Sequence, residues 1–352
     1  MSRLLDVGPG GLTYDAAGVS IAAGDAAVAR YAPLAAAATR PEVLGGIGGF
    51  AGMIGVPRAY RDPVLVASAD GVGTKLEIAR RLGRYDTVGV DLVAMLVDDL
   101  VCLGAEPLFV LDYVAVGRLD PEREAALVAG VAAGCRRAGA ALLGGETAEH
   151  AGVMAPDEVD LAGFAVGVLE RGSELGPARV RGGDALVALA SPNLRSNGFS
   201  LVRRVLAGEG SDLAAPAYPG APHTLGDELL RPSVIYAPAV LAVRAALGDA
   251  LRAAAHITGG GIVGNVARVL PAQCDAVVEL DRVDTPEIFL EIQRRGPVSA
   301  EEMVRVFNCG LGLVLVTDPA AAATAVAVAQ GAGVPAARVG TITPGTGKVH
   351  VQ

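Results

Sequence analysis

Two kinds of apolar pattern alternate along the chain and predict both strands and helices. Continuous apolar runs at 63–68, 107–117 and 159–170 end at glycine, proline or charged residues, as is typical of buried strands. Between residues 87 and 104 the apolar positions recur every third or fourth residue, which predicts a helix with one apolar face. The segment 120–139 predicts another helix, because it opens with Asp-Pro and ends with two arginines and a glycine.

The second half of the chain repeats this alternation. Strand-like runs at 184–190, 275–280 and 311–317 are separated by helix-like segments. The first forty residues are predicted to be mostly helical, with an interruption near Pro33.

A stretch rich in glycine, proline and charge, residues 171–184, lies between two strand-like runs. It predicts two domains, 1–170 and 171–352, a division that suits a chain of 352 residues. The chain is 52% hydrophobic but only 4% aromatic, so its core must be built from Ala, Val, Leu and Ile. Alanine-rich helices packed on Val/Leu strands would do this, which predicts an α/β (α+β) fold.

Charge and cysteine content exclude several classes of protein. The net charge is −9 and no long basic run is present, so we expect no nucleic-acid partner. The four cysteines are far apart and predict neither a zinc site nor a disulfide framework. We see no signal-peptide pattern and no stretch apolar enough to span a bilayer, and we therefore expect a cytoplasmic protein without membrane contact.

The stretch SADGVGTK, residues 68–75, directly follows a strand-like run. Asp70 offers a carboxylate of the kind that holds Mg²⁺, while Thr74 and Lys75 offer a hydroxyl and an ammonium group to phosphate oxygens. The alternative is a tight turn with solvated ends. Upstream, LGGIGGFAG (44–52) is either a flexible turn or a loop whose backbone N–H groups approach an anion closely.

Two pairs of acids are candidates for metal binding. Asp98 and Asp99 lie in the predicted apolar helix, where adjacent side chains point about 100° apart, so at most one joins a metal site directly. A carboxylate buried there needs a cation, and the alternative is a solvated charge. Glu146 and Glu149 follow a short strand, and their spacing could place them on one side of a turn. There they would bind metal, move protons or form an ordinary acidic loop.

Two further polar loops precede predicted helices. Ser196 and Asn197 stand before one of them, where they either bind an anion with the helix N–H groups or simply cap the helix. His256 and three glycines lead into the other, as a phosphate cradle or as a structural turn. Cys309 has no His/Asp partner pattern and is predicted to be structural.

The order of eight motifs resembles the phosphoribosylformylglycinamidine cyclo-ligase family, also called AIR synthetase. The motifs are RPEVLGGIGGF, DGVGTK, DLVAMLVDDL, GAEPLFVLDY, GGETAE, SNGFSLVR, HITGGG and FNCGLG, and the resemblance extends from about residue 14 to residue 343. It implies a two-domain fold whose N-terminal sheets pair across a homodimer. It also implies ATP-dependent ring closure of formylglycinamidine ribonucleotide to aminoimidazole ribonucleotide, through phosphorylation of the formamide oxygen and attack by the amidine nitrogen.

The resemblance also implies which residues form the site. The catalytic residues are expected to be His256, Glu146 and Lys75, with His256 as a candidate to handle the proton, and the Mg²⁺ ligands to be Asp70 and Asp99. The residues expected to bind ATP are Gly45, Gly46, Gly48, Gly49, Asp70, Gly71, Gly73, Thr74, Lys75 and Glu149. The residues expected to bind the substrate are Arg195, Ser196, Asn197, Gly198, Thr258, Gly259 and Gly260.

Four positions depart from the residues usual in that family. Ala69 replaces Thr, Asp98 replaces Asn and Arg195 replaces His. Val234 stands where Arg or Lys is usual, so one cation is missing. A catalytically silent nucleotide-binding paralogue, or another ATP-dependent member of the superfamily such as a small-molecule kinase, is the alternative function.

Overall fold

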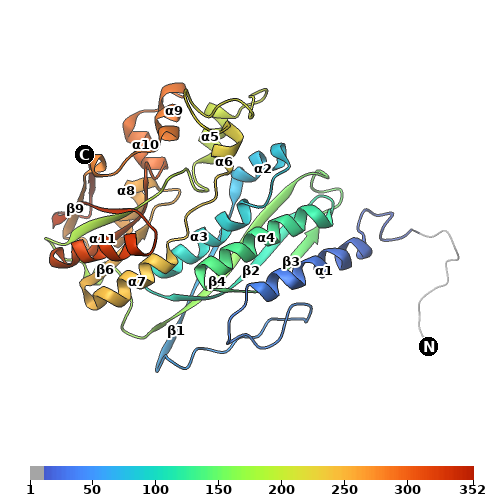
Figure 1. The fold of residues 1–352 in the computed structure, drawn as a ribbon, viewed down its shortest axis with the longest axis horizontal. Coiled ribbons are helices and arrows are strands. Elements are labelled where there is room, and N and C mark those ends of the chain that lie inside the picture. Colours follow the sequence, from blue (N-terminus) through green and yellow to red (C-terminus); the bar gives the residue numbers. More distant parts are fainter. Residues whose placement is uncertain (1–11) are drawn as a thin grey trace.

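Two β-sheets with helices packed around them make up the structure (Figure 1). This computed structural model describes residues 12–352, so part of the predicted N-terminal helical region lies outside the described residues. The prediction of a mixed α/β protein is confirmed. No helix among the described residues has both the length and the apolar character needed to cross a membrane.

The first sheet comes from the first half of the chain and has the strand order β1-β4-β2-β3. Its strands are β1 Pro63–Gly71, β2 Glu106–Val116, β3 Ala141–Glu149 and β4 Val159–Glu170. β4 pairs antiparallel with β1 and β2, whereas β2 and β3 are parallel. A parallel pair needs a crossover connection, which α4 (Pro121–Ala138) supplies. Strands β1 and β3 are therefore the opposite edges of this sheet.

One face of this sheet is covered by helices and the other is open. The covering helices are α1 (Ile21–Ala37), α3 (Val88–Cys102) and α4, which lie together on the same side (Figure 1). On the opposite face Leu65 and Phe164 are 60% and 53% exposed. The sheet therefore presents apolar side chains to its surroundings on its uncovered face.

The second sheet comes from the second half of the chain and has the order β10-β7-β9-β5-β8-β6. Its strands are β5 Ala185–Ala190, β6 Leu251–His256, β7 Cys274–Val278, β8 Leu311–Thr317, β9 Ala336–Pro344 and β10 Val349–Val351. The remaining helices are α2 Leu76–Leu82, α5 Phe199–Leu206, α6 Leu225–Leu230, α7 Ala237–Leu247, α8 Gly261–Val266, α9 Glu287–Arg295, α10 Ala300–Val306 and α11 Ala322–Gly331. This half of the chain closes over the helix-covered side of the first sheet.

Helix α3 lies between the two halves of the structure. It packs on β1, β4 and α4 and also touches β6 and α7. Every residue of α3 except Asp99 and Cys102 is buried. The sequence predicted a single apolar face, and the structure differs because the second half of the chain covers the face that carries Asp91 and Asp98.

Asp91 is fully buried and is bound from three directions. Lys75 Nζ lies 2.6 Å from its Oδ2, and Ser233 donates to Oδ1 from the backbone N–H at 2.8 Å and from Oγ at 2.5 Å. The Lys75 ammonium also donates to the backbone carbonyls of Arg195 and Arg231, at 3.0 and 2.9 Å. This one cation therefore links α3 to two segments of the second half.

Asp98 lies seven residues further on, on the same face of α3, and is also fully buried. Arg195 Nη2 donates to its Oδ2 at 2.9 Å, and the backbone N–H groups of Tyr236 and Ala237 donate to Oδ1 at 2.8 and 3.0 Å. The Arg195 guanidinium lies over the Tyr236 ring, 4.7 Å from its centroid. Two of the four departures from the family pattern are thus the two halves of one buried ion pair.

The predicted interruption of the N-terminal helix is wrong. Helix α1 runs through Pro33 without a break. Tyr31 and Ala35, on either side of Pro33, are both buried in the core, so packing against the rest of the first half holds the helix together where the backbone hydrogen bond is missing.

Two strands are longer than predicted. Asp70 belongs to β1 and pairs with Gly163, so it is a strand residue rather than a loop residue. Glu146 and Glu149 both lie on β3, paired along β2. Since strand side chains alternate between faces, an odd spacing places these two carboxylates on opposite faces, and the expected shared side of a turn is wrong.

Asp112 is a buried carboxyl group on the helix-covered face of β2. It is 8% exposed, and its Oδ2 has no hydrogen-bond partner among residues 12–352. Burial raises the pKa of Asp112 to about 7, because the charged form loses its hydration there. The folded state therefore holds a proton that an unfolded chain releases at lower pH.

We predict that Asp112 makes the folded protein less stable as the pH rises from 5 to 7.5. Its folded pKa lies above its unfolded value of about 4, so its contribution is complete below pH 4 and is lost as the pH rises toward 7. Asp112→Asn removes this titration. Over that interval the wild type should lose about 2 kcal/mol more free energy of unfolding than the variant, measured by urea denaturation at both pH values. Parallel pH dependence of the two proteins would contradict the prediction.

We also predict that the effects of Asp98→Asn and Arg195→His are not additive. Asp98→Asn alone leaves a buried guanidinium without its counter-ion and should cost about 3–5 kcal/mol of unfolding free energy. Arg195 has a φ of 60°, a region that histidine tolerates better than most residues, so the second change is compatible with the backbone.

The double variant should be more stable than the sum of the single changes predicts, by about 1 kcal/mol or more. Urea denaturation of the four proteins measures this coupling energy. Additive losses would show that the two side chains do not stabilise each other.

Candidate functional site

Three loops meet near the C-terminal end of α3. They are the loop after β1, the SNG segment at 196–198 and the glycine-rich loop after β6. Ser196 Oγ donates to the Val72 carbonyl at 2.8 Å, and Asn197 Nδ2 approaches Met95 Sδ of α3 at 3.5 Å. Gly259 lies beside Asn197, whose Oδ1 is 3.8 Å from the position that a Cβ on this glycine would occupy. The structure thus brings together three motifs that are far apart in the sequence.

His256 and Asp99 form the polar centre of this region. His256 ends β6 and is only 5% exposed. Its Nδ1 lies 2.9 Å from Asp99 Oδ1, and Ser68 Oγ donates to Asp99 Oδ2 at 3.2 Å. His256 Nε2 is buried, has no hydrogen-bond partner among the described residues and lies 3.9 Å from Asp98 Oδ2. Both ring nitrogens therefore face α3.

Asp70 lies beside Asp99. Ser68 and Asp70 project from the same face of β1, and Ser68 already reaches Asp99. Crowding by neighbouring protein atoms raises the pKa of Asp70, and the negative charge of Asp99 raises it further. Burial opposes ionisation of Asp99, but the hydrogen bonds from His256 and Ser68 outweigh it and hold the pKa of Asp99 below its ordinary value.

The two carboxylates fit a Mg²⁺ ion that is shared with a ligand. No cluster of three or more His, Cys, Asp or Glu side chains suited to a metal occurs in residues 12–352. Mg²⁺ usually keeps several waters and takes one or two carboxylates together with substrate phosphates, so two acids suffice. The Asp99 side chain is 43% exposed, and its oxygens have lone pairs beyond those used by His256 and Ser68.

The remaining residues of the loops are held in place by neighbours. Thr74 is exposed, and its hydroxyl lies 3.4 Å from that of Ser200. Thr258 Oγ1 donates to Asn265 Oδ1 at 3.3 Å, and Asn265 Nδ2 donates to the Gly261 carbonyl at 2.8 Å. The backbone of the glycine-rich loop, including the exposed Gly259 and Gly260, is thus fixed from within by one asparagine.

Three glycines of these loops are constrained by their backbone conformation, by a close neighbour or by a hydrogen bond. Gly73 and Gly198 have φ values of 68° and 74°, which favour glycine. A Cβ on Gly198 would also lie 2.4 Å from the Phe307 ring. Gly71 ends β1 and donates its backbone N–H to Asp70 Oδ1 at 2.7 Å.

Lys75 and Arg195 lie away from the opening. Both side chains are fully buried, and their charges are taken up by Asp91 and Asp98. The expected contacts of Lys75 with ATP and of Arg195 with the substrate do not describe their positions in this structure. Val234, the position that lacks the usual cation, packs against the hydrophobic core next to Ser233.

The predicted glycine loop lies at the other edge of the first sheet. The strand pairing connects Asp70 with Gly163, Gly163 with Asp112, and Asp112 with Gly145 in one row. Asp70 and Gly145 are therefore three strand spacings apart, about 14 Å. Glu146 follows Gly145, so it lies far from Asp70 within one chain. The residues expected to bind ATP are divided between two edges.

A cavity of about 750 Å³ opens at that other edge. Gly46, Gly48 and Gly49 line it together with Glu146, while Gly45 is exposed just before it. Glu149 points to the opposite face, where its carboxylate accepts hydrogen bonds from the backbone N–H groups of Ser20 and Leu119, at 3.1 and 2.7 Å. Glu149 thus anchors the starts of α1 and α4 rather than facing the glycine loop.

Sequence reasoning missed Ser68, Asp91 and Asn265. Ser68 was detectable, because it stands two residues before Asp70 and so shares its face of the strand. Asn265 follows the three glycines at a spacing of one helical turn, which could have suggested a brace for the loop. Asp91 gave no local signal, since its partner Lys75 comes from another element.

Two family models match most of the chain. The model described as "AIR synthase related protein, N-terminal domain" matches residues 51–169, and "AIR synthase related protein, C-terminal domain" matches residues 181–352. Solved structures share this fold. A thiamine-monophosphate kinase from Stenotrophomonas maltophilia has a TM-score of 0.66 at 22% identity, covering 95% of this chain and 96% of its own. Hydrogenase maturation protein HypE in complex with ATP has a TM-score of 0.65 at 18% identity, covering 99% and 94%.

Relatives of higher identity cover nearly the whole chain. The phosphoribosylformylglycinamidine cyclo-ligase of Sorangium cellulosum is 51% identical over 88% of this chain and 89% of its own length. That of Bordetella avium is 49% identical over 95% of both chains, and that of Xanthomonas oryzae pv. oryzae is 44% identical over 97% and 99%. This chain therefore belongs to the phosphoribosylformylglycinamidine cyclo-ligase family, whose members are ATP-dependent ligases of purine biosynthesis.

Proposed function

We propose that the chain closes the ring of formylglycinamidine ribonucleotide with ATP, giving aminoimidazole ribonucleotide, ADP and phosphate. The observation that carries the proposal is the meeting of Asp70, Asp99 and His256 with the SNG and glycine-rich loops. An amide oxygen leaves poorly until it is phosphorylated. The protein therefore has to hold the two reacting ends of one substrate together and to neutralise the phosphoryl group.

Asp70 and Asp99 are the residues that would hold Mg²⁺ with the phosphates of ATP. Their two neighbouring negative charges oppose each other, and a cation between them relieves this repulsion. A Mg²⁺ ion held there would supply positive charge to neutralise the charge that develops on the phosphate oxygens. The exposed Thr74 hydroxyl and the backbone of Gly71 and Gly73 stand beside this position to contact phosphate oxygens.

His256 is assigned as a positioning residue for Asp99 in place of the expected proton acceptor. Its Nδ1 faces the Asp99 carboxylate and its Nε2 is buried against α3, so neither nitrogen opens toward the substrate loops. An Nδ1–H donated to Asp99 fixes the carboxylate that binds the metal. The proton released by the attacking nitrogen then goes to water or to a carboxylate outside this pair.

We infer further that the enzyme is a homodimer whose subunits complete each other's sites. The glycine loop and Glu146 lie at one edge of the sheet, and Asp70 lies at the other. A second copy packed on the uncovered face would bury Leu65 and Phe164 and bring its β3 edge to the β1 edge of the first copy. The partner's Glu146 is then available to the substrate, in agreement with its expected catalytic role.

We also propose a domain boundary near residue 170 and a cytoplasmic location. The two family models support the boundary, since one ends at residue 169 and the other begins at residue 181. The location follows from the reaction, which draws on the ATP and nucleotide precursors of the cytoplasm.

The purified protein should form aminoimidazole ribonucleotide only when ATP and Mg²⁺ are both present. Asp99→Asn should lower turnover by roughly 10²-fold or more, because the amide keeps the hydrogen bond from His256 but supplies no charge to the metal. Glu301→Gln, at an exposed position of α10, is the matched control and should leave turnover unchanged. ATP binding without product in the wild type would favour the silent paralogue, and near-normal turnover of Asp99→Asn would remove Asp99 from the site.

Mixing two inactive variants tests the shared site. Asp99→Asn and Glu146→Gln homodimers should each be inactive, but after subunit exchange one site of each mixed dimer is intact. About a quarter of wild-type turnover should then return, because half of the dimers are mixed and each has one good site. Turnover that stays at the level of the separate variants would show that each chain builds its site alone. Light scattering of the same samples gives the oligomeric state.

A further inference from the structure

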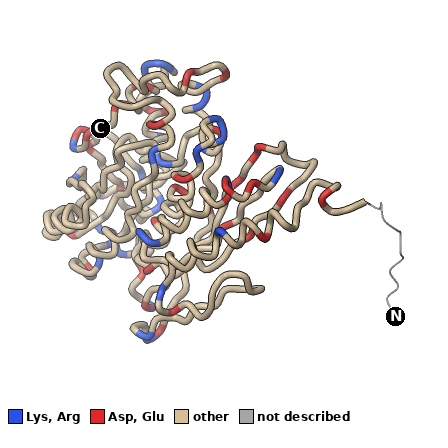
Figure 2. The backbone as a smooth tube through the Cα atoms, turned by 45° about the vertical axis from the view of Figure 1, so that its right-hand side comes forward, with Lys and Arg blue, Asp and Glu red and all other residues tan. Residues whose placement is uncertain are grey.

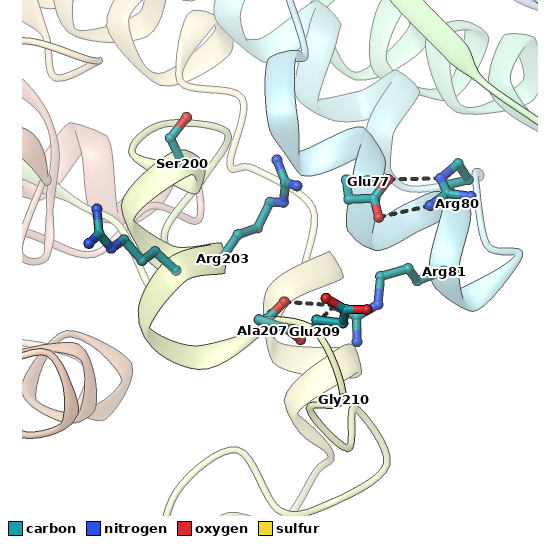
Figure 3. Close-up of a pocket in the computed structure, with 10 residues that line it drawn as sticks. Glu77, Arg80, Arg81, Ser200, Arg203, Ala207, Glu209 and Gly210 are labelled. Carbon is teal, nitrogen blue, oxygen red and sulfur yellow. Dashed lines mark hydrogen bonds and ion pairs between the residues drawn. The ribbon is translucent and has the colours of Figure 1, made fainter. Parts of the chain in front are cut away.

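A second cleft, of about 590 Å³, lies between α2 and α5 (Figure 3). Its charged lining consists of four arginines and two glutamates, namely Arg80, Arg81, Arg203, Arg204, Glu77 and Glu209. Guanidinium groups therefore outnumber carboxylates two to one, in a chain whose net charge is −9. The cleft therefore carries a local excess of positive charge.

The two arginines of α2 are already fixed. Arg80 forms a two-pronged pair with Glu77, with N–O distances of 2.7 and 2.9 Å, and also pairs with Asp157. Arg81 donates to the backbone carbonyls of Ala207 and Ser211, at 2.7 and 3.1 Å. These contacts give the α2 wall a rigid arrangement of N–H groups, since each guanidinium carries five donors and uses only part of them.

The two arginines of α5 have no such partners. Among the described residues, neither Arg203, which is half-buried, nor Arg204, which is exposed, forms an ion pair or a side-chain hydrogen bond. Figure 3 shows Arg203 extending from α5 toward Glu77 of α2. The hydrogen bond from Arg80 lowers the pKa of Glu77, and the charges of Arg203 and Arg81 lower it further, so three guanidinium groups act on this one carboxylate.

We propose that this cleft binds a small phosphate-bearing anion, at a site separate from the Asp99–His256 centre. Guanidinium groups from two facing helices can chelate a phosphate through paired N–H donors. Ser200 at one end of the cleft adds a hydroxyl, which also contacts Thr74 of the loop after β1. A ligand in the cleft therefore bridges α2, from the first half of the chain, and α5, from the second.

The size and surroundings of the cleft favour a small molecule over a polymer. Its volume lies within the range of about 300–1,000 Å³ that is usual for small-molecule sites. Figure 2 shows basic and acidic residues interspersed along the chain rather than a continuous basic stripe, which a nucleic acid would need. Inorganic phosphate and the phosphate group of a nucleoside monophosphate share the chemistry that the arginines recognise.

Calorimetric titration with inorganic phosphate and with AMP, at fixed ionic strength, tests this site. The wild type should bind both, and Arg203→Ala/Arg204→Ala should weaken binding by at least about tenfold, because a charge-assisted hydrogen bond contributes that much. The matched control is Arg136→Ala/Arg137→Ala, which also removes two consecutive arginines from the last turn of a helix, both of them exposed. Circular dichroism checks that all variants are folded.

Each result decides the proposal. For the binding that Arg203→Ala/Arg204→Ala weakens, a higher affinity for AMP than for phosphate identifies a nucleotide as the ligand of the cleft. Equal or weaker binding of AMP identifies free phosphate, and either result supports the site. Three results overturn it: no binding to the wild type, an equal loss in the control pair, or unchanged binding in Arg203→Ala/Arg204→Ala. The last result would place any bound phosphate at the loops around Asp99 instead.

Discussion

Two carboxylates buried on one face of α3 require cations from other parts of the chain, and the rest of the structure depends on how they are supplied. Asp91 takes Lys75 and Asp98 takes Arg195. A buried charge without its counter-ion is strongly destabilising, so the side chains of Lys75 and Arg195 are each held in a single position beside their carboxylates. Lys75 ends the short segment that follows β1, and Arg195 directly precedes the SNG segment. The two buried pairs therefore hold the loops of the candidate site in place without themselves facing it.

The features that were predictable from sequence are those set by local pattern. Helix α3 was predicted within two residues at each end, because the spacing of its apolar residues has the helical period. The same period predicted that Asp98 and Asp99 diverge. In the structure Asp98 enters the buried junction, while Asp99 meets His256 at the opening.

Other features depend on partners that no local pattern reveals. The residue type of Lys75 suggested a phosphate contact and the family resemblance suggested a substrate contact for Arg195, but each is paired with a carboxylate that is distant in sequence. The separation of Glu146 from Asp70 follows from the strand order β1-β4-β2-β3, which depends on pairing across the whole first half of the chain. The family resemblance placed Glu149 at ATP, and its spacing from Glu146 was interpreted as one side of a turn, whereas on a strand it faces the helices.

The Asp98–Arg195 pair also bears on the history of these two positions, for which the family resemblance implies asparagine and histidine as the usual residues. Arginine opposite asparagine would leave a permanent positive charge in the interior, since a guanidinium does not lose its proton in proteins. Aspartate opposite histidine is different, because an imidazole takes up a proton near neutral pH and becomes the counter-ion. A lineage that reached the present pair by single substitutions is therefore expected to have acquired the aspartate before the arginine.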